Sequence, residues 1–425
     1  MKVAVIGTGI SGLTVAAGLA GQHDLTVFES EDWVGGHTST VDVEDDGKPL
    51  AVDTGFIVFN DWTYPNFIAM LERLGVAWQA SEMSFSLQCE RSGLEYNGTS
   101  INSLFAQRRN LVNPRFLHMI WEILRFNRIA PRFLQQQDET TPLGDWLRDN
   151  GFRGAFVEHY VVPMGRAIWS AEADAMLRFP ARFFIDFFHR HGFLSVDNRP
   201  TWRTVTGGSR EYVRKLSAPF RDSIRTSTPV VSVRRMPQQV VLRTAHGDIA
   251  QFDAVVFACH SDQALAMLED PSREESQILR AFPYAANEAI LHTDASLLPR
   301  RPLARAAWNY HLLREPGRGV PVTYDMNVLQ SLSTRHRYLV SLNLGDRIDP
   351  ERVLRRFNYS HPVYTPEGVA AQRRHGEISG VRRSFYCGAY WRYGFHEDGV
   401  VSGLEVLGQF ERWKADAQRP LPRVG

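Results

Sequence analysis

Blocks of apolar residues alternate with polar or glycine-rich stretches over the first 29 positions of the chain. Residues 3–6 are all apolar, a run typical of a buried parallel strand. A glycine-rich stretch follows at 7–12, and residues 13–19 are mostly small or apolar, which suits a helix that packs on a sheet. A second, mostly apolar run at 25–28 ends at an acidic residue. This order predicts a strand–turn–helix–strand unit of a Rossmann-like sheet.

The glycine-rich turn has the sequence Gly-Thr-Gly-Ile-Ser-Gly, which is typical of a loop that binds a dinucleotide. Gly7 permits the tight turn, Gly9 lets the backbone approach a pyrophosphate, and Gly12 lets helix and strand pack closely. The helix that begins at Ile10 and Ser11 presents free N–H groups and a partial positive charge to the phosphates. We therefore expect these five residues at a dinucleotide cofactor.

An acidic residue follows the second strand, at the position where it can bind a ribose. Glu29 lies 22 positions after Gly7 and is expected to accept hydrogen bonds from the ribose hydroxyls, with Ser30 at the same site. A glycine-rich turn alone also fits an ordinary tight turn. The strand, the helix and the acidic residue in register favour a dinucleotide site instead.

The next two motifs favour FAD over NAD. A Gly-Gly pair at 35–36 resembles the extended FAD fingerprint of the superfamily that contains flavin amine oxidases, protoporphyrinogen oxidase and phytoene desaturase. In that family the pair passes beside the cofactor, and the residue after it is usually Arg, where this chain has His. The turn at 53–56 matches the family's next pattern, an acid-x-Gly turn that leads under the flavin. The resemblance implies FAD contacts at Gly35, Gly36, His37, Thr38, Thr54, Gly55 and Phe56.

Later parts of the chain resemble further segments of the same superfamily. Residues 385–389 resemble the strand end that approaches the pyrophosphate, and 394–403 resemble the last motif, whose helix points its N-terminus at the flavin. That helix dipole would stabilise negative charge on a reduced flavin. Residues 229–233 resemble the strand that meets the adenine, and 255–259 form another buried strand. In these parts the resemblance implies cofactor contacts at Val231, Cys259, Gly388, Glu397, Asp398, Gly399 and Val400.

The order of these segments predicts two domains. The expected fold class is α/β (α+β overall), with a Rossmann-like FAD-binding domain and an inserted substrate domain of sheet plus helices. The FAD-binding domain is expected to be discontinuous and to contain residues 1–75, 204–270 and 378–425. Residues 76–203 and 271–377 are expected to build the substrate-binding domain.

Periodicity predicts several elements inside the two inserts. Strand-like runs occur around 85–88, 289–292 and 338–342. Thr141 is a plausible N-cap of a helix with Pro142 in its first turn. A helix is also expected over 114–129, with one face formed by Phe116, Leu117, Ile120, Ile123, Leu124 and Asn127.

Composition narrows the class of protein. The 425 residues are 44% hydrophobic, which is ordinary for a globular protein, and no run of about 18 uncharged apolar residues predicts a membrane-spanning helix. No signal peptide is visible before the first strand. The three cysteines have no close pair, which favours a reducing, cytoplasmic location and argues against a disulfide or metal framework. A net charge of +1 gives no general attraction to nucleic acid.

The first insert is rich in aromatic and arginine residues. The aromatic residues are expected mainly in a large helical core, and a channel for a long apolar substrate is the alternative for some of them. Six arginines and a single acid, Glu122, fall between 104 and 133. Such a stretch, with Phe116, Trp121 and Phe126, suits contact with the inner face of the cell membrane, and an ordinary solvated helix face is the alternative.

Lysine and cysteine positions bear on the flavin chemistry. Many flavin amine oxidases hold a lysine at the flavin from the second insert, but residues 271–377 contain no lysine. The resemblance therefore supports the flavin scaffold more than the amine oxidase reaction. No cysteine lies in 260–386, and Cys387 belongs to the pyrophosphate-approaching segment, so we expect FAD to be bound non-covalently.

Tyr390, Trp391 and His396 are the candidates for the catalytic side of the flavin. The resemblance places Tyr390 and Trp391 in the loop where the family has an aromatic residue facing the substrate. His396 and His37 are the groups with a near-neutral pKa that the motifs bring to the cofactor. A hydrogen bond to backbone or phosphate is the alternative role for His396, and His37 is expected to contact phosphate or the ribityl chain.

The chain resembles most closely a bacterial group of NAD/FAD-binding, amine-oxidase-like proteins encoded near cyclopropane-fatty-acid-synthase-like methyltransferases. The resemblance rests on segments 53–60 and 387–399. It implies an FAD-dependent dehydrogenase or desaturase that transfers hydride to flavin N5 from an apolar, fatty-acyl or phospholipid substrate. The alternatives are an amine oxidase that produces peroxide and a non-catalytic flavin-binding partner of the lipid methyltransferase.

Overall fold

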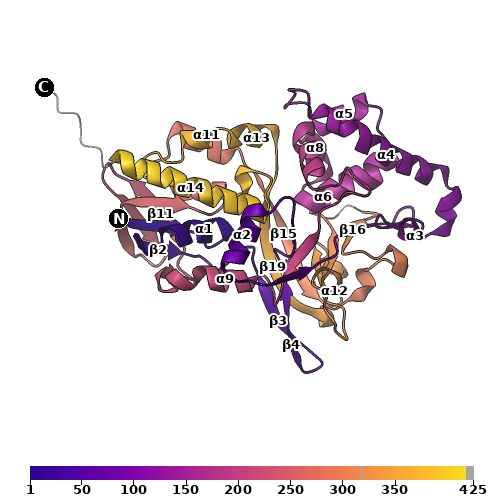
Figure 1. The fold of residues 1–425 in the computed structure, drawn as a ribbon, viewed down its shortest axis with the longest axis horizontal. Coiled ribbons are helices and arrows are strands. Elements are labelled where there is room, and N and C mark those ends of the chain that lie inside the picture. The colour runs from indigo at the N-terminus through magenta and orange to yellow at the C-terminus, as the bar shows by residue number, and fades with distance from the viewer. Residues whose placement is uncertain (316, 318, 418–425) are drawn as a thin grey trace.

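The computed structural model describes residues 1–315, 317 and 319–417 (Figure 1). Residues 418–425, the end of the predicted FAD-binding segments, lie outside the described residues. The described part of the chain builds a five-stranded and a seven-stranded sheet, and helices pack on both. This arrangement confirms the predicted fold class.

A five-stranded parallel sheet occupies one half of the molecule. Its central strand is β1 (Lys2–Ile6), between β2 (Asp24–Phe28) and β14 (Ala254–Phe257). The edge strands are β10 (Ile224–Arg225) and β20 (Ser384–Tyr386). The strands predicted over 3–6 and 25–28 are thus confirmed, and the one predicted over 255–259 is present but ends at Phe257. Segments from both ends and the middle of the chain meet in one sheet.

Two layers cover this parallel sheet. Val3 and Val5 face a helical layer of α1 (Ile10–Leu19), α9 (Arg210–Ser217) and α14 (His396–Ala417). Ala4 and Ile6, whose side chains point to the other face of β1, pack on a small antiparallel sheet. Because both faces of β1 are covered, its residues 3–6 are all apolar and buried. The antiparallel sheet consists of β11 (Val230–Arg235), β12 (Val240–Thr244) and β13 (Ile249–Phe252).

The seven-stranded sheet lies in the other half of the molecule. Its order is β19-β15-β18-β17-β16-β7-β8, and its neighbouring strands are antiparallel except for the parallel pair β16 and β7. Because β7 precedes the helical region and β16 follows it, this pair joins two distant parts of the chain. The strands are β7 (Phe85–Cys89), β8 (Leu94–Asn97), β15 (Tyr284–His292), β16 (Trp308–Leu312), β17 (Val322–Asp325), β18 (Leu339–Leu342) and β19 (Val353–Pro362).

Helices pack on the face of this sheet that carries Leu87, Tyr310 and Val322 (Figure 1). Their contact is filled by buried aromatic side chains, so the predicted aromatic core is confirmed. The main helices are α4 (Pro114–Phe133), α5 (Leu143–Asp149), α6 (Val162–Trp169), α7 (Ala173–Arg178) and α8 (Ala181–Arg190). The aromatic core includes Phe116, Phe126, Phe133, Phe156, Trp169, Phe179, Phe183, Phe184, Phe187 and Phe188.

The predicted inward face of α4 is wrong in part. Leu117 and Leu124 were expected on that face, but their side chains are 41% and 52% exposed. The helix has apolar residues on two sides, so the helical period alone does not show which side meets the core. The buried positions of α4 are Phe116, Met119, Glu122, Phe126, Ala130 and Phe133.

The predicted start of α5 needs a smaller correction. Pro142 is the N-cap and the helix begins at Leu143, so Thr141 lies outside it. The backbone N–H of Thr141 donates to Asp138 Oδ1 at 3.0 Å instead. The asparagine-capped start of α4 shows the more usual pattern, because Asn113 accepts a hydrogen bond from the backbone N–H of Arg115.

The remaining elements pack around the two main sheets. In the described part of the chain, no helix is long and apolar enough to span a bilayer, no three metal-binding side chains gather at one place, and all three cysteines are free. These elements are β3 (Thr40–Asp45), β4 (Lys48–Asp53), β5 (Phe59–Asn60), α2 (Pro65–Arg73), β6 (Trp78–Ala80), α3 (Ile101–Leu104), β9 (Trp202–Val205), α10 (Ser261–Met267), α11 (Arg273–Arg280), α12 (Met326–Leu329) and α13 (Pro366–Gln372).

Candidate functional site

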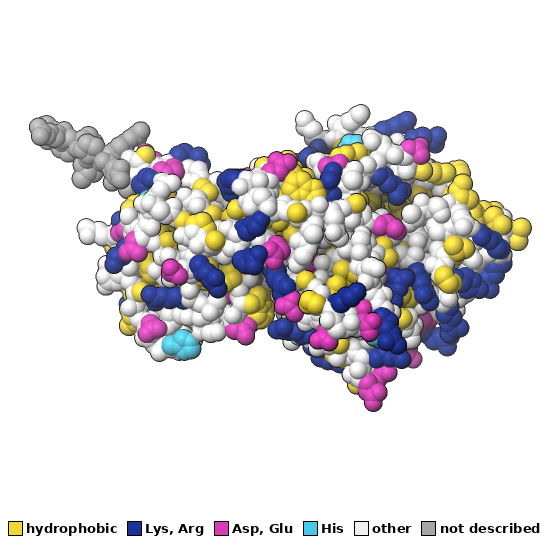
Figure 2. All heavy atoms as spheres, turned by 60° about the horizontal axis from the view of Figure 1, so that its bottom comes forward, with side chains coloured by type: hydrophobic (Ala, Val, Ile, Leu, Met, Phe, Trp, Pro, Cys, Tyr) yellow, Lys and Arg dark blue, Asp and Glu magenta, His cyan; other side chains and the backbone are white. Residues whose placement is uncertain are grey.

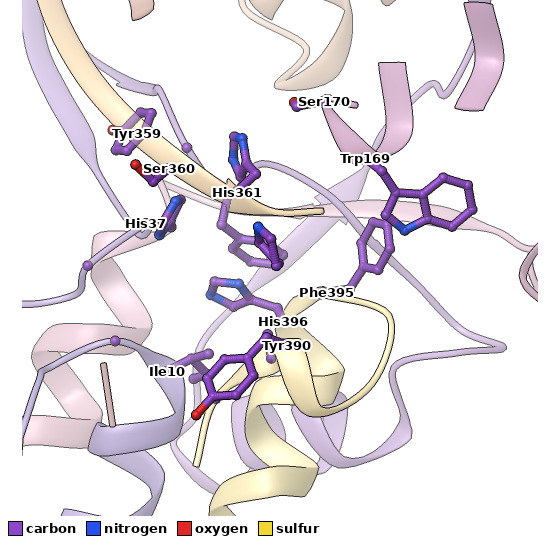
Figure 3. Close-up of a pocket in the computed structure, with 18 of the residues that line it drawn as sticks. Ile10, His37, Trp169, Ser170, Tyr359, Ser360, His361, Tyr390, Phe395 and His396 are labelled. Carbon is purple, nitrogen blue, oxygen red and sulfur yellow. The ribbon is translucent and has the colours of Figure 1, made fainter. Parts of the chain in front are cut away.

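A cavity of about 860 Å³ extends from the ends of β1, β2 and β14 to the seven-stranded sheet and helices α6 and α8. It begins at the carboxyl ends of parallel strands, where open α/β sheets bind their ligands. Figure 3 shows part of its wall, with side chains from both halves of the molecule. The predicted residues that line it are Gly7, Gly9, Ile10, Ser11, Glu29, Ser30, Gly35, Gly36, His37, Thr54, Gly55, Phe56, Val231, Cys259, Gly388, Tyr390 and His396.

The three glycines of the first turn have different roles. Gly7 has φ +106°, and a Cβ there would lie 2.6 Å from the carbonyl oxygen of Ala258. A Cβ on Gly12 would overlap the carbonyl oxygen of Gly7, so Gly12 lets α1 pack on β1 and does not line the cavity. A Cβ on Gly9 would meet nothing within 4 Å. The space beside Gly9 is therefore free for a ligand, as a pyrophosphate would require.

Glu29 organises the loop around this space. Its carboxylate accepts a hydrogen bond from the backbone N–H of Thr8 at 2.9 Å and another from the Thr8 hydroxyl. It also accepts one from the backbone N–H of Glu31 at 3.0 Å. Because Glu29 ends β2 and lines the cavity, its position fits a ribose-binding residue.

The Gly-Gly pair packs directly against the first turn. Gly35 and Gly36 have φ of +131° and +58°, and a Cβ on Gly36 would lie 3.1 Å from the Cα of Gly9. The backbone N–H of Gly35 donates to the Thr8 hydroxyl at 3.2 Å. Side chains at these positions would therefore disturb the same loop that encloses the space beside Gly9.

A group of histidines surrounds the next part of the cavity. His37 stacks on Tyr359, with ring centroids 5.0 Å apart, and lies 5.3 Å from His361 and 6.1 Å from His260. Burial lowers the pKa of His37 to about 4, of His260 to about 4 and of His361 to about 3, so all three are neutral at pH 7. The His37 Nε2 atom is buried without a partner among the described residues, and a cofactor oxygen would satisfy it.

His396 begins α14 and faces the cavity (Figure 3). Its ring stacks on Phe56, with centroids 3.5 Å apart. Its Nε2 atom lies 3.0 Å from the hydroxyl of Thr38 and 2.8 Å from that of Tyr212. Burial holds the pKa of His396 well below its usual value. The ring is thus neutral and fixed in place. Thr38 contacts the ring but does not itself line the cavity.

Several predicted residues support the wall without lining it. Glu397 accepts hydrogen bonds from the backbone N–H groups of Asn66 and Phe67 and thereby caps α2. A Cβ on Gly399 would lie 2.6 Å from Ile10, so Gly399 allows α14 to pack on α1. The predicted residues that the structure places behind the wall are Gly12, Thr38, Trp391, Glu397, Asp398, Gly399 and Val400.

Asp398 gives a prediction for the pH dependence of stability. Burial raises its pKa to about 7, so the folded protein holds a proton that the unfolded chain releases near pH 4. The stability contributed by this proton is complete below pH 4 and is lost as the pH rises through 7. A difference of about three pKa units corresponds to a loss of stability on the order of 4 kcal/mol, at 1.36 kcal/mol per unit. We expect that Asp398→Asn does not show this loss of stability with rising pH.

The measurement is the free energy of unfolding of wild type and Asp398→Asn in denaturant at several pH values. The asparagine oxygen can still accept the Phe395 backbone N–H that Asp398 accepts at 2.9 Å. The difference between the two proteins should grow in favour of the variant from pH 4 to pH 7. A difference that stays constant with pH would contradict the raised pKa.

The far part of the cavity is aromatic. Trp169 and Phe395 point into it in Figure 3, and Phe187, Tyr364 and Tyr393 form more of its wall. At its outer end Gly98, Thr99 and Arg199 line the cavity and are exposed to solvent. Burial raises the pKa of Tyr160 to about 12. The positive charge of the nearby Arg199 lowers this pKa and so opposes the effect of burial.

Charge is scarce along this wall. Among the described residues that line the cavity, Glu29 and Arg199 are the only Asp, Glu, Lys or Arg side chains. Arg199 donates from Nε to the carbonyl oxygen of Ser195 at 3.2 Å, and its terminal guanidinium nitrogens have no partner in the described part of the chain. Sequence reasoning missed His260, His361 and Tyr359, which the pairing of distant strands brings to the cavity, and Arg199, which lies in an irregular loop before β9.

Comparison with known proteins gives a family match over most of the chain. The sequence pattern of a family described as flavin containing amine oxidoreductase matches residues 10–406. No curated protein sequence matches the chain.

Solved structures share the fold at low sequence identity. The CLA-producing fatty acid isomerase from P. acnes has a TM-score of 0.68 at 15% identity, covering 96% of this chain and 98% of that one. Cyclohexylamine oxidase from Brevibacterium oxydans has a TM-score of 0.70 at 14% identity, covering 98% and 99%. Wild-type putrescine oxidase bound to putrescine has a TM-score of 0.63 at 15% identity, covering 97% and 99%.

Proposed function

Because the chain belongs to the family of flavin-containing amine oxidoreductases, we propose that this FAD-dependent oxidoreductase removes hydride from the apolar chain of an acyl substrate. The observation that carries the proposal is the wall of the cavity. Beyond the histidine group it is aromatic and uncharged as far as its solvent-exposed end, where Arg199 lies. A long apolar chain with an anionic head fits this distribution.

The same wall argues against an amine substrate. A cationic ammonium group is held most strongly by a free carboxylate, since cation–π contacts with aromatic rings contribute only about 0.5–2 kcal/mol. Glu29, the one carboxylate on the described wall, is engaged by Thr8 and Glu31 in the dinucleotide loop. The second part of the chain that supplies the site, 271–377, also contains no lysine. Both features support an acyl chain over an amine.

The residues present fit FAD. The free space beside Gly9, the N-terminus of α1 and the carboxylate of Glu29 would hold the pyrophosphate and the ribose. When bound, FAD would supply the acceptor for the hydride that leaves one carbon, while a proton would leave the neighbouring carbon to a neutral base of the wall such as His37, so that a C=C bond forms. Burial raises the pKa of Cys259 to about 12, which disfavours its reactive thiolate and supports non-covalent binding.

The chain's own residues would position the substrate and exclude water. The aromatic wall keeps the acyl chain dry, and the neutral His396 and His37 offer hydrogen bonds without adding charge. The solved structures that share the fold include a fatty acid isomerase and two amine oxidases, so the fold itself does not decide between an acyl and an amine substrate.

The proposal can be tested by anaerobic addition of substrates to the yellow holoenzyme. Long-chain fatty acids and phospholipids form one panel, and putrescine and cyclohexylamine form the other. We expect loss of flavin colour with a member of the acyl panel and none with the amines. Loss of colour with amines alone, with peroxide formed on admission of air, would overturn the acyl proposal.

Arg199 gives a sharper prediction. We expect Arg199→Gln to raise the KM for a carboxylate substrate by about 10- to 100-fold, because a hydrogen bond to a charged group contributes about 1.5–3 kcal/mol. Because Arg199 lies at the exposed end of the cavity, kcat should change little. Steady-state kinetics of the two proteins measures both constants.

Arg203 provides the matched control. It is a neighbouring arginine on β9 that does not line the cavity, so Arg203→Gln should leave KM unchanged. The KM for the methyl ester of the same substrate should be nearly the same for wild type and Arg199→Gln, because the ester carries no negative charge. Equal KM values for wild type and Arg199→Gln with the free acid would show that Arg199 does not bind the head group.

A further inference from the structure

The outer face of α4 carries large apolar side chains that the fold does not bury. Leu117, Trp121 and Leu124 are 41%, 54% and 52% exposed and lie four and three residues apart, so they share one side of the helix. Leu111 and Val112, in the turn just before α4, are 53% and 81% exposed. These five residues are called the apolar patch below. Exposed side chains that gather in this way mark an interaction surface.

The apolar patch is not needed for the packing of α4. The opposite side of the helix supplies its core contacts, and Phe116, Met119 and Phe126 there are almost fully buried. Phe116 and Phe126 therefore cannot reach a lipid surface, contrary to the expectation from sequence, whereas Trp121 can. The helix thus has one apolar side for the core and a second one for a partner.

Arginines surround the apolar patch. Arg115, Arg128 and Arg132 are exposed, and their side chains have no hydrogen bond or ion pair with the described residues. The guanidinium of Arg125 lies 5.6 Å from the ring centre of Trp121. The patch's surroundings also include Arg108 and Arg109.

Acidic groups do not balance this charge within the segment. Glu122 is the one acid between 104 and 133, and it is buried, with its Oε2 atom 3.6 Å from His118. Figure 2 shows yellow apolar side chains with dark blue basic ones around them at the end of the molecule that carries α3 and α4. An apolar face bordered by arginines and containing a tryptophan suits the boundary between lipid tails and anionic headgroups.

One exposed end of the cavity lies just before α3, in the chain segment that leads to α4. Gly98 and Thr99, at its exposed end, lead directly into α3, where Ile101 is 79% exposed. The ring of Tyr96, which also lines the cavity, lies 5.8 Å from the ring of Phe116 on α4. An acyl chain could therefore pass from a bilayer into the cavity with little exposure to water, a point that rests on the proposed function.

We propose that the apolar patch and its arginines bind the surface of a bilayer that contains anionic lipid. The apolar side chains enter the headgroup boundary, and the arginines contact lipid phosphates. Binding through this surface needs no membrane-spanning helix.

Sedimentation of the holoenzyme with vesicles tests the proposal. Wild type should pellet with vesicles of phosphatidylcholine and phosphatidylglycerol, pellet less as salt is added, and stay in solution with phosphatidylcholine alone. Arg115→Ser, Arg128→Ser and Arg132→Ser together should weaken binding by about a hundredfold, at about fivefold for each charge. Leu117→Ser, Trp121→Ser and Leu124→Ser together should abolish it.

A matched set of substitutions gives the control. Met236, Val381 and Leu404 are each 45% exposed and lie in the other half of the molecule, so their triple serine variant should bind vesicles as wild type does. Flavin content reports that each variant is folded, independently of any substrate. Equal loss of binding in the control set, or wild type that stays in solution with anionic vesicles at low salt, would overturn the proposal. The proposal would also be overturned if wild type formed a dimer in solution, the serine variant of Leu117, Trp121 and Leu124 were monomeric, and neither protein bound vesicles.

Discussion

Gly9→Ala is expected to fold as wild type does and to bind FAD very poorly. Gly9 has φ −61° and ψ 172°, which alanine adopts without strain, and its new methyl group would meet no protein atom within 4 Å. The methyl would occupy the space where the backbone meets the pyrophosphate. Loss of two charge-assisted hydrogen bonds at about 1.5–3 kcal/mol each would weaken FAD binding by about 10²- to 10⁴-fold.

Flavin absorbance and denaturant unfolding of the purified protein measure the two parts of this prediction. Gly376→Ala is the control, because its methyl also meets no atom and Gly376 is not at the cavity, so that variant should stay yellow. Gly12→Ala is the opposite case, since its methyl would overlap Gly7 and should prevent folding. Gly9→Ala protein with stoichiometric FAD would show that this loop does not hold the pyrophosphate.

Glu275→Ala is expected to lower the free energy of unfolding by about 3 kcal/mol, because the buried Arg235 loses one of its two carboxylate partners and keeps only Asp270, at 3.1 Å. Arg235 on β11 is 1% exposed and forms an ion pair with Glu275 on α11, which is 3% exposed. The hydroxyl of Tyr386 on β20 also donates to Glu275, at 2.7 Å. The pair thus ties the small antiparallel sheet to the edge of the parallel sheet, next to the loop of Gly388.

The neighbouring residue offers the control for this prediction. Glu274 is exposed, and Glu274→Ala should change the free energy of unfolding by less than about 0.5 kcal/mol. Although burial opposes it, the hydrogen bond from Arg235 holds the pKa of Glu275 below its usual value, so this stabilisation should be lost at acid pH. Equal unfolding curves for Glu275→Ala and Glu274→Ala would contradict the role of the pair.

The sequence predicts the parts of the fold and site that depend on local structure. The run at 3–6 forms β1, and the glycines at 7, 9 and 12 form the turn beside it, because steric limits on single residues decide both. The apolar periodicity of α4 predicts a helix but not its orientation, since two of its sides are apolar. Only the packing of α8 and the aromatic core decides which side is buried.

The rest of the site depends on strand pairing over long distances. His361 lies on β19, which pairs with β15, and His260 follows β14. Arg199 lies in an irregular loop before β9, where no period gives a signal. Glu397 and Gly399 show a further difficulty, because a motif near a cofactor also contains residues that hold its helices together. A motif alone does not separate the two roles.

The pairing of β14 with β20 sets an order for folding during synthesis. Val256 pairs with Phe385, which the ribosome adds 129 residues later, or about 6–26 s later at 5–20 residues per second. Until then β14 is an open sheet edge, and the wall residues Gly388 and Tyr390 have not been made. The nascent chain can therefore bind FAD in its complete site only late in synthesis. Slow translation of residues 258–384 prolongs the time in which the open edge of β14 can form wrong pairings.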